Sequence, residues 1–134
     1  MTDITRDIIK AVISRVRAAV PAVSNRVYVF PPQGLQFPYI GMSTLANDLG
    51  AKEIDHFEMI ITFHIFAQND TDSAVEQCQD IGKLIFDDLN DTPSLTLDDG
   101  DFVAAHFDGF QQLLPEDEGK TCQMVARYKF LASD

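Results

Sequence analysis

The sequence predicts a single α+β domain, with a mostly antiparallel β-sheet and two helices packed on one face of that sheet. Three observations lead to this fold class. Long segments alternate apolar and polar residues with the period of a β-strand, and two other segments repeat apolar residues with the period of a helix. The chain has 134 residues, of which 46% are hydrophobic, which suits one core. One domain over residues 1–134 is therefore expected.

Each expected helix carries an apolar stripe. Apolar residues in the segment 4–20 recur at spacings of one, three and four, its basic residues take the other face, and Pro21 ends it. Its expected core residues are Ile4, Ile8, Ile9, Val12, Ile13, Val16 and Val20. The second helix is expected to begin at an N-cap, Asp72 or Ser73, with Glu76 in the capping-box position. Its expected buried residues are Ala74, Cys78, Ile81, Ile85 and Leu89.

Alternating residues predict the strands. Strands are expected at 26–30, 38–48, 54–68 and 121–133, and two short ones should flank the Asp99-Gly100 turn within 94–107, with a loop at 114–120. One face of the segment 54–68 is uniformly apolar, through Phe57, Met59, Ile61, Phe63 and Ile65. The last strand repeats this pattern through Cys122, Met124, Ala126, Tyr128 and Phe130. The opposite faces are mixed, which is typical of a sheet with one packed and one partly open side.

The charge of the chain is unevenly distributed. The formal net charge is -11, yet residues 1–30 carry +3 and the remainder carries -14. A surface this acidic argues against general binding to duplex DNA, because neutralisation of phosphates supplies most of that affinity. The asymmetry serves solubility, or it allows opposite patches to pair between copies of an oligomer.

The N-terminus lacks the pattern of a signal peptide and no segment has the apolar length of a membrane span, so a soluble, intracellularly made protein without a membrane partner is expected.

The polar residues offer little catalytic chemistry. His56 and His64 share one strand face but should lie roughly 27 Å apart, so they cannot bind one metal ion, and His106 could join only one of them. The acids around Gly100 lack the ligand spacing of a calcium loop. Nucleophile and phosphate-loop motifs are missing from the sequence. We therefore expect no enzymatic activity, no cofactor and no metal site.

The two cysteines are expected to be buried free thiols. Cys78 and Cys122 lie far apart in the sequence, each on the apolar face of its element. Neither has a basic neighbourhood in sequence that would favour a thiolate. Core packing accounts for both without a disulfide.

The segment RVYVFPPQGLQFPYIGM, residues 26–42, begins and ends like a strand but is interrupted by proline and glycine. Pro31 and Pro32 favour an extended path, Gly34 permits a turn, and Pro38 holds the preceding residue extended. A stiff loop loses little entropy when it docks, so a subunit or partner interface and a plain connection between strands both remain open. The candidate interface residues are Phe30, Pro31, Pro32, Gln33, Gly34, Leu35, Phe37 and Pro38.

The same segment, together with the pattern of helices and strands, resembles the tail-completion family of long-tailed bacteriophages. Members of that family are tail terminators, or tail-to-head joining proteins, with relatives in prophages and gene transfer agents. The resemblance covers nearly the whole chain. This chain departs from the family pattern in having an extra proline, Pro31, and an acidic second half. Its most specific matches are Val27, Tyr28, Pro32, Gln33, Gly34, Phe37, Pro38, Tyr39 and Ile40.

The resemblance implies a structural protein of the virion. Such proteins form a homo-oligomeric ring, commonly a hexamer, that caps the head-proximal end of the tail tube, stops tube growth and joins the tail to the head. The implied partners are the major tail-tube protein and a head–tail connector or head completion protein, with DNA passing through the ring without specific binding. Assembly in the host cytoplasm and a place at the head–tail junction follow. The alternatives are a head-side completion or tail-tube-like protein, and a small-ligand binding module.

Overall fold

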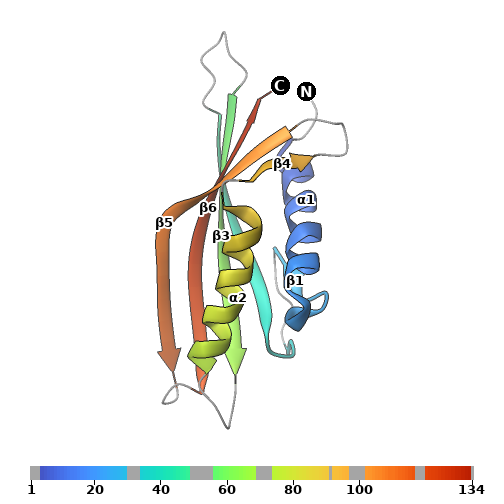
Figure 1. The fold of residues 1–134 in the computed structure, drawn as a ribbon. Helices are drawn as coiled ribbons and strands as arrows, with labels where there is room; N and C mark the ends of the chain where they lie inside the picture. The colour runs from blue at the N-terminus through green and yellow to red at the C-terminus, as the bar shows by residue number, and fades with distance from the viewer. Residues whose placement is uncertain are drawn as a thin grey trace.

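A computed structural model describes residues 4–29, 34–48, 56–68, 74–90, 92–96, 102–116 and 120–133 (Figure 1). The elements within these ranges are α1 (Ile4–Ala19), the short 3-10 helix η1 (Pro21–Val23), β1 (Val27–Tyr28), β2 (Tyr39–Asp48), β3 (His56–Gln68), α2 (Ala74–Leu89), β4 (Thr92–Thr96), β5 (Phe102–Glu116) and β6 (Thr121–Ser133). The strands form one sheet in the order β1-β2-β3-β6-β5-β4. Its neighbouring strands are antiparallel, except that β1 and β2 are parallel.

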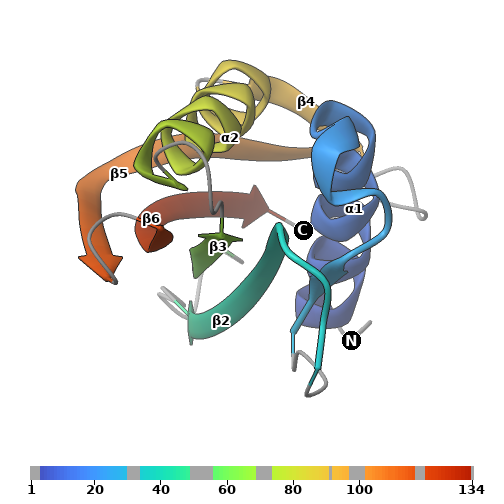
Figure 2. The same cartoon turned by 90° about the horizontal axis from the view of Figure 1, so that it is seen from below.

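Both helices cover one face of this sheet, which confirms the predicted fold class (Figure 2). Helix α2 packs directly on β3, β5 and β6, whereas α1 lies beside α2 and contacts β1 and β4. An ion pair joins the two helices, with Arg15 Nε 3.1 Å from Asp88 Oδ2. Because both side chains of this pair are partly exposed, the apolar stripes supply most of the helix packing.

The buried residues follow the predicted stripes. All five predicted residues of α2 and all five of β6 are buried, as are Met59, Ile61, Phe63 and Ile65 of β3. On α1, Ile8, Val12, Val16 and Val20 are fully buried, whereas Ile9 and Ile13 are only partly buried and lie at the margin of the core. Ile9 and Ile13 thus belong to the predicted stripe but lie at its edge, because the apolar stripe of α1 is wider than the surface it packs against. The side chains of Ile4 and Phe57, and the N-cap at 72–73, lie outside the described residues.

An aromatic chain crosses the core. Phe63 of β3 and Phe107 of β5 both make edge contacts with Tyr128 of β6, at centroid distances of 5.6 and 5.4 Å. Phe107 also contacts Phe86 of α2 at 5.6 Å. Edge-to-face geometry of this kind is favourable beyond the buried area alone. The chain of rings therefore ties three strands to α2.

Helix α2 approaches the sheet closely at Gly82. A Cβ atom built at this position would lie 2.6 Å from Met124 Sδ and 3.2 Å from its Cε. Gly82 thus leaves room for the Met124 side chain between the helix and β6. The glycine lowers intrinsic helix stability, and packing of the sheet against α2 offsets that cost.

The prediction was wrong for β5, which was expected to end by residue 107, and for residues 114–116, which were expected to form part of a loop. Strand β5 continues to Glu116, and its pairing with β6 resumes at Gln111 after an irregularity. Phe107 pairs with Tyr128 and Gln111 with Ala126, so residues 108–110 bulge opposite Arg127. Gly109 has a φ of 76° at this bulge, a conformation that suits glycine. The bulge shifts the side-chain alternation, which made the second half of β5 unrecognisable as a strand.

The first predicted strand is shorter than expected. Of the described residues 26–29 in this segment, Val27 and Tyr28 form a strand, and they pair in parallel with Ile40 and Gly41 of β2. The tip of the predicted hairpin at Asp99-Gly100 lies outside the described residues.

In the part of the chain that the structure describes, no helix is long and apolar enough to cross a membrane.

Candidate functional site

The structure describes half of the candidate interface loop. Gly34, Leu35, Phe37 and Pro38 are described, whereas residues 30–33 lie outside the described residues. Gly34 is exposed, has a φ of 78° and has open space around its Cβ position. Leu35, Phe37 and Pro38 are half-buried, and the peptide bond between Phe37 and Pro38 is cis. The loop thus leaves Leu35 and Phe37 with apolar surface that a partner can cover.

Two arginines hold the base of this loop. Arg26 Nε donates to Pro38 O at 3.0 Å, and the backbone N–H of Ile40 donates to Arg26 O at 2.9 Å. Arg17 Nη2 donates to Val27 O at 3.1 Å, which links α1 to β1. Charge-assisted bonds of this kind are stronger than neutral ones. The segments that enter and leave the loop are therefore fixed next to each other, and the loop projects from a rigid base.

Aromatic side chains continue from the loop onto the open face of the sheet. Phe37 lies 5.4 Å from the ring of Tyr39, and Tyr39 stacks on Phe66 of β3 at 4.7 Å. All three side chains are half-buried. Such rings combine large apolar area with few rotatable bonds, which favours them at protein interfaces. The row of Phe37, Tyr39 and Phe66 therefore extends the candidate interface beyond the loop. The position of Phe66 in the sequence gave no sign of this contact, because Phe66 lies on a different strand.

A polar ladder crosses β2, β3 and β6 on the open face. The amide nitrogen of Gln123 lies 3.1 Å from His64 Nδ1, and Ser43 Oγ lies 3.2 Å from His64 Nε2. Because the amide nitrogen donates, Nδ1 accepts and the protonated Nε2 donates to Ser43. Partial burial lowers the pKa of His64, which favours this neutral form. His64 thus orders the face without any sign of a metal or catalytic role.

We expect His64 to make the domain less stable in mild acid. Its folded pKa is below the ordinary value of 6.5, so the unfolded chain binds the proton first as the pH falls. Neutral His64 makes its full contribution to the free energy of unfolding above pH 6.5. This contribution is lost as the pH falls through the folded pKa of His64. Thermal denaturation at about pH 7.5 and about pH 5 should show a larger fall in Tm for the wild type than for His64→Gln. Equal falls in the two proteins would contradict the assignment.

Charged residues form a network further along the same face. Asp108, at the β5 bulge, lies 3.2 Å from Arg127 Nε and 3.9 Å from Lys129 Nζ. Lys129 Nζ is also 3.8 Å from Glu58 Oε2. These side chains are partly exposed, so the pairs add little stability individually but set the charge pattern of the face. The sequence indicated that Glu58, Arg127 and Lys129 share this face, because they alternate with the predicted core residues of β3 and β6.

The two cysteines are free and buried, as predicted. The structure also brings them together, with Cys78 Sγ 3.4 Å from Cys122 O, which their distance in sequence did not indicate. Burial, with a smaller effect of Cys122, raises the pKa of Cys78 to about 12. A protonated thiol is a poor nucleophile.

Among the described residues, no group of three His, Cys, Asp or Glu side chains is placed to bind a metal.

A groove of about 960 Å³ runs along the outer side of α1. Its lining residues are Arg6, Ile9, Lys10, Ile13, Ser14, Arg17 and Asn25. These side chains place cations around an apolar floor, and no acidic side chain of the described residues lines it. The sequence placed the basic residues on this face of the helix but gave no sign of a groove, because its shape depends on η1 and the residues that follow it.

The fold was compared with known proteins. No protein-family model matches the sequence, and no curated protein matches it either. One solved structure is similar over the whole length of both chains, with a TM-score of 0.79 and 12% sequence identity. It is described as the virion of a native gene transfer agent (GTA) particle. The two chains share a fold. At this identity the likeness concerns the fold alone.

Proposed function

We propose that this chain is a structural protein of a phage-like virion. The observation that carries the proposal is the likeness, over the full length of both chains, to a chain from a gene transfer agent virion. An independent line of support comes from the sequence, in which Val27, Tyr28, Gly34 and the Phe37–Ile40 segment resemble the tail-completion family. Fold by itself does not define function, but here it agrees with the resemblance carried by this segment.

Within the virion, the proposed role is that of a tail terminator. The chain forms a ring on the head-proximal end of the tail tube, stops tube polymerisation and joins the tail to the head. A heterologous contact that closes by rotation makes such a ring from identical copies. Leu35 and Phe37 supply apolar surface on a rigid loop base, and the open sheet face adds Tyr39 and Phe66. This arrangement favours contacts with neighbours over the binding of a small substrate.

The proposed partners are further copies of the chain, the tail-tube protein and a head-side connector or completion protein. DNA passes through the ring without specific binding. The net charge of -11 supports this point, because an acidic surface on the lumen repels phosphates. The proposed site of action is the head–tail junction, after assembly in the bacterial cytoplasm.

Deletion of the gene, with complementation by a plasmid copy, tests this role. Electron microscopy of the particles should show heads and tails that are not joined, and the plasmid copy should restore joined particles. Restoration separates loss of the protein from an effect on neighbouring genes. Joined particles in normal numbers without the protein would refute the proposal.

A further inference from the structure

The groove on α1 has features that fit an acidic helix. Arg6, Lys10 and Arg17 are separated by four and seven residues, a spacing that places them on one side of the helix. Arg17 Nη2 donates to Val27 O, which fixes this guanidinium beside the groove. Ile9 and Ile13 give the groove an apolar floor.

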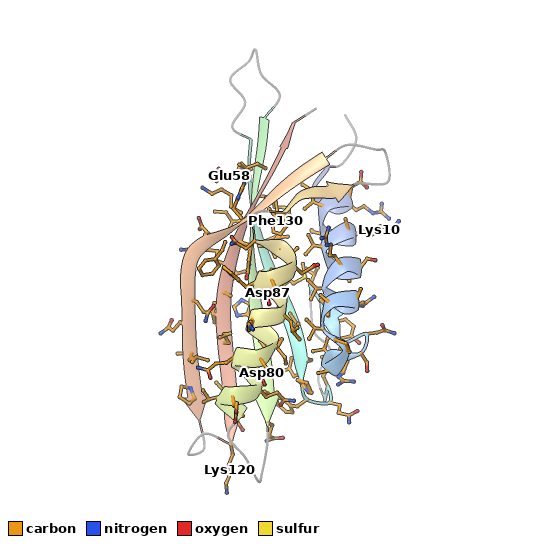
Figure 3. All side chains as sticks on the ribbon, viewed as in Figure 1. Lys10, Glu58, Asp80, Asp87, Lys120 and Phe130 are labelled. Carbon is orange, nitrogen blue, oxygen red and sulfur yellow. The ribbon has the colours of Figure 1, made fainter. Side chains whose placement is uncertain are left out.

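The matching surface lies on α2 of the same sequence. Glu76, Asp80 and Asp87 are exposed and are also separated by four and seven residues, so they form an acidic stripe. Leu84, with 41% of its surface exposed, lies beside this stripe. In Figure 3, Lys10 points outward from α1, on the side away from α2, while Asp80 and Asp87 lie on the side of α2 away from the sheet. The basic groove and the acidic stripe of one copy therefore face different neighbours.

We propose that the groove on α1 binds the acidic stripe of α2 from the next copy. This inference rests on the proposed ring and names one of its contacts. Helices α1 and α2 run in opposite directions (Figure 1). If the ring axis is parallel to the helices, rotation leaves helix direction unchanged, so α1 of one copy is antiparallel to α2 of the next. In an antiparallel alignment, Arg6 meets Asp87 and Ile9 meets Leu84. Arg17 then meets Glu76 at the other end.

Lys83 is the residue of the stripe that does not fit the charge pattern. It is exposed and would lie beside Lys10 in this alignment. Asp80 and Asp87 are three and four residues from Lys83 on the same helix, so their carboxylates offset its charge. The stripe keeps a net negative charge, and the contact is favourable at both of its ends.

A second copy fits the groove better than a nucleic acid does. Phosphate binding would use the cations but would leave the exposed parts of Ile9 and Ile13 facing water. The acidic remainder of the chain would also repel a polyanion. An amphipathic helix with an acidic stripe matches both the charge of the groove and its apolar floor.

Charge reversal on the full chain tests this contact. One variant carries Arg6→Glu and the other carries Asp87→Lys, because these two residues meet in the proposed alignment. Sedimentation velocity should show self-association of the wild type that weakens between about 50 mM and about 500 mM salt. Each variant alone should associate at least about tenfold more weakly. An equimolar mixture of the two should associate again, because each reversed helix then meets an oppositely reversed partner.

The mixture distinguishes a contact between copies from misfolding, because two unfolded variants cannot restore each other. A matched control compares Arg6→Glu with Lys120→Glu, which makes a similar charge reversal at an exposed residue outside the groove. The control should associate like the wild type. Wild-type association in either variant, a mixture that stays dissociated, or a wild type that does not associate would each overturn the inference. Binding of a DNA oligonucleotide that only Arg6→Glu abolishes, without recovery in the mixture, would also overturn it.

This test can fail while the proposed function stands. Rings and joined tails made by the groove variants would refute the α1–α2 contact alone. Failure of the proposed function is seen instead in the deletion strain, as particles that join normally without the protein.

Discussion

Replacing Leu35 and Phe37 together by serine is expected to abolish tail joining while leaving the domain folded. Both side chains are half-buried at the loop that Arg26 holds, and neither belongs to the main core. Truncating a central apolar anchor of an interface costs about 2 kcal/mol or more. Two such losses would weaken a contact by several hundredfold. Complementation of a deletion strain, scored by electron microscopy for joined particles, measures the effect.

The matched control is Gln36→Ser. Gln36 lies between the two anchors and is exposed, so its replacement changes the same loop without removing apolar contact area. This control should restore joined particles, and both purified proteins should melt close to the wild-type Tm. Normal joining by the double variant would mean that the loop only connects β1 to β2.

Phe63→Ala is expected to cause the largest loss of stability. Phe63 is fully buried on β3, and its ring contacts Tyr128 in the aromatic chain that links the sheet to α2. A cavity of this size costs about 3–5 kcal/mol. Because small domains have total stabilities of about 5–15 kcal/mol, the loss is a large fraction of the whole. Thermal denaturation should show a fall in Tm of about 10–20 °C.

Phe66→Ala provides the comparison on the same strand. Phe66 points to the opposite face of β3, where its ring stacks on Tyr39 and is half-buried. Its removal should cost about 1 kcal/mol, in line with a single aromatic pair. Similar losses for the two variants would contradict the assignment of one packed and one open face.

The sequence predicted the parts of the fold in which one periodic pattern lasts for a whole element. The alternation in β6 identified Tyr128 and Phe130 as core residues, and the 3.6-residue period did the same for Ile81 and Ile85 in α2. Each of these elements packs one face against a single neighbouring layer, so local pattern and final environment agree.

Other features depend on contacts between distant segments. The bulge at Gly109 interrupts the alternation of β5, so the strand could not be followed past Phe107. Nothing in the two residues of β1 indicates that they pair in parallel with β2. The groove on α1 depends on how Asn25 and the segment after the helix lie beside it. The prolines of the 30–38 loop predicted its stiffness. The hydrogen bond from Arg26 to the base of the loop was not predictable from the sequence.

The most direct measurement of the central claim is the length distribution of tails made without this protein. A terminator stops growth of the tube, so we expect tails in the deletion strain to lack a fixed upper length and to be detached from heads. The complemented strain should return to one narrow length with heads attached. Joined tails of normal, fixed length in the deletion strain would contradict the account.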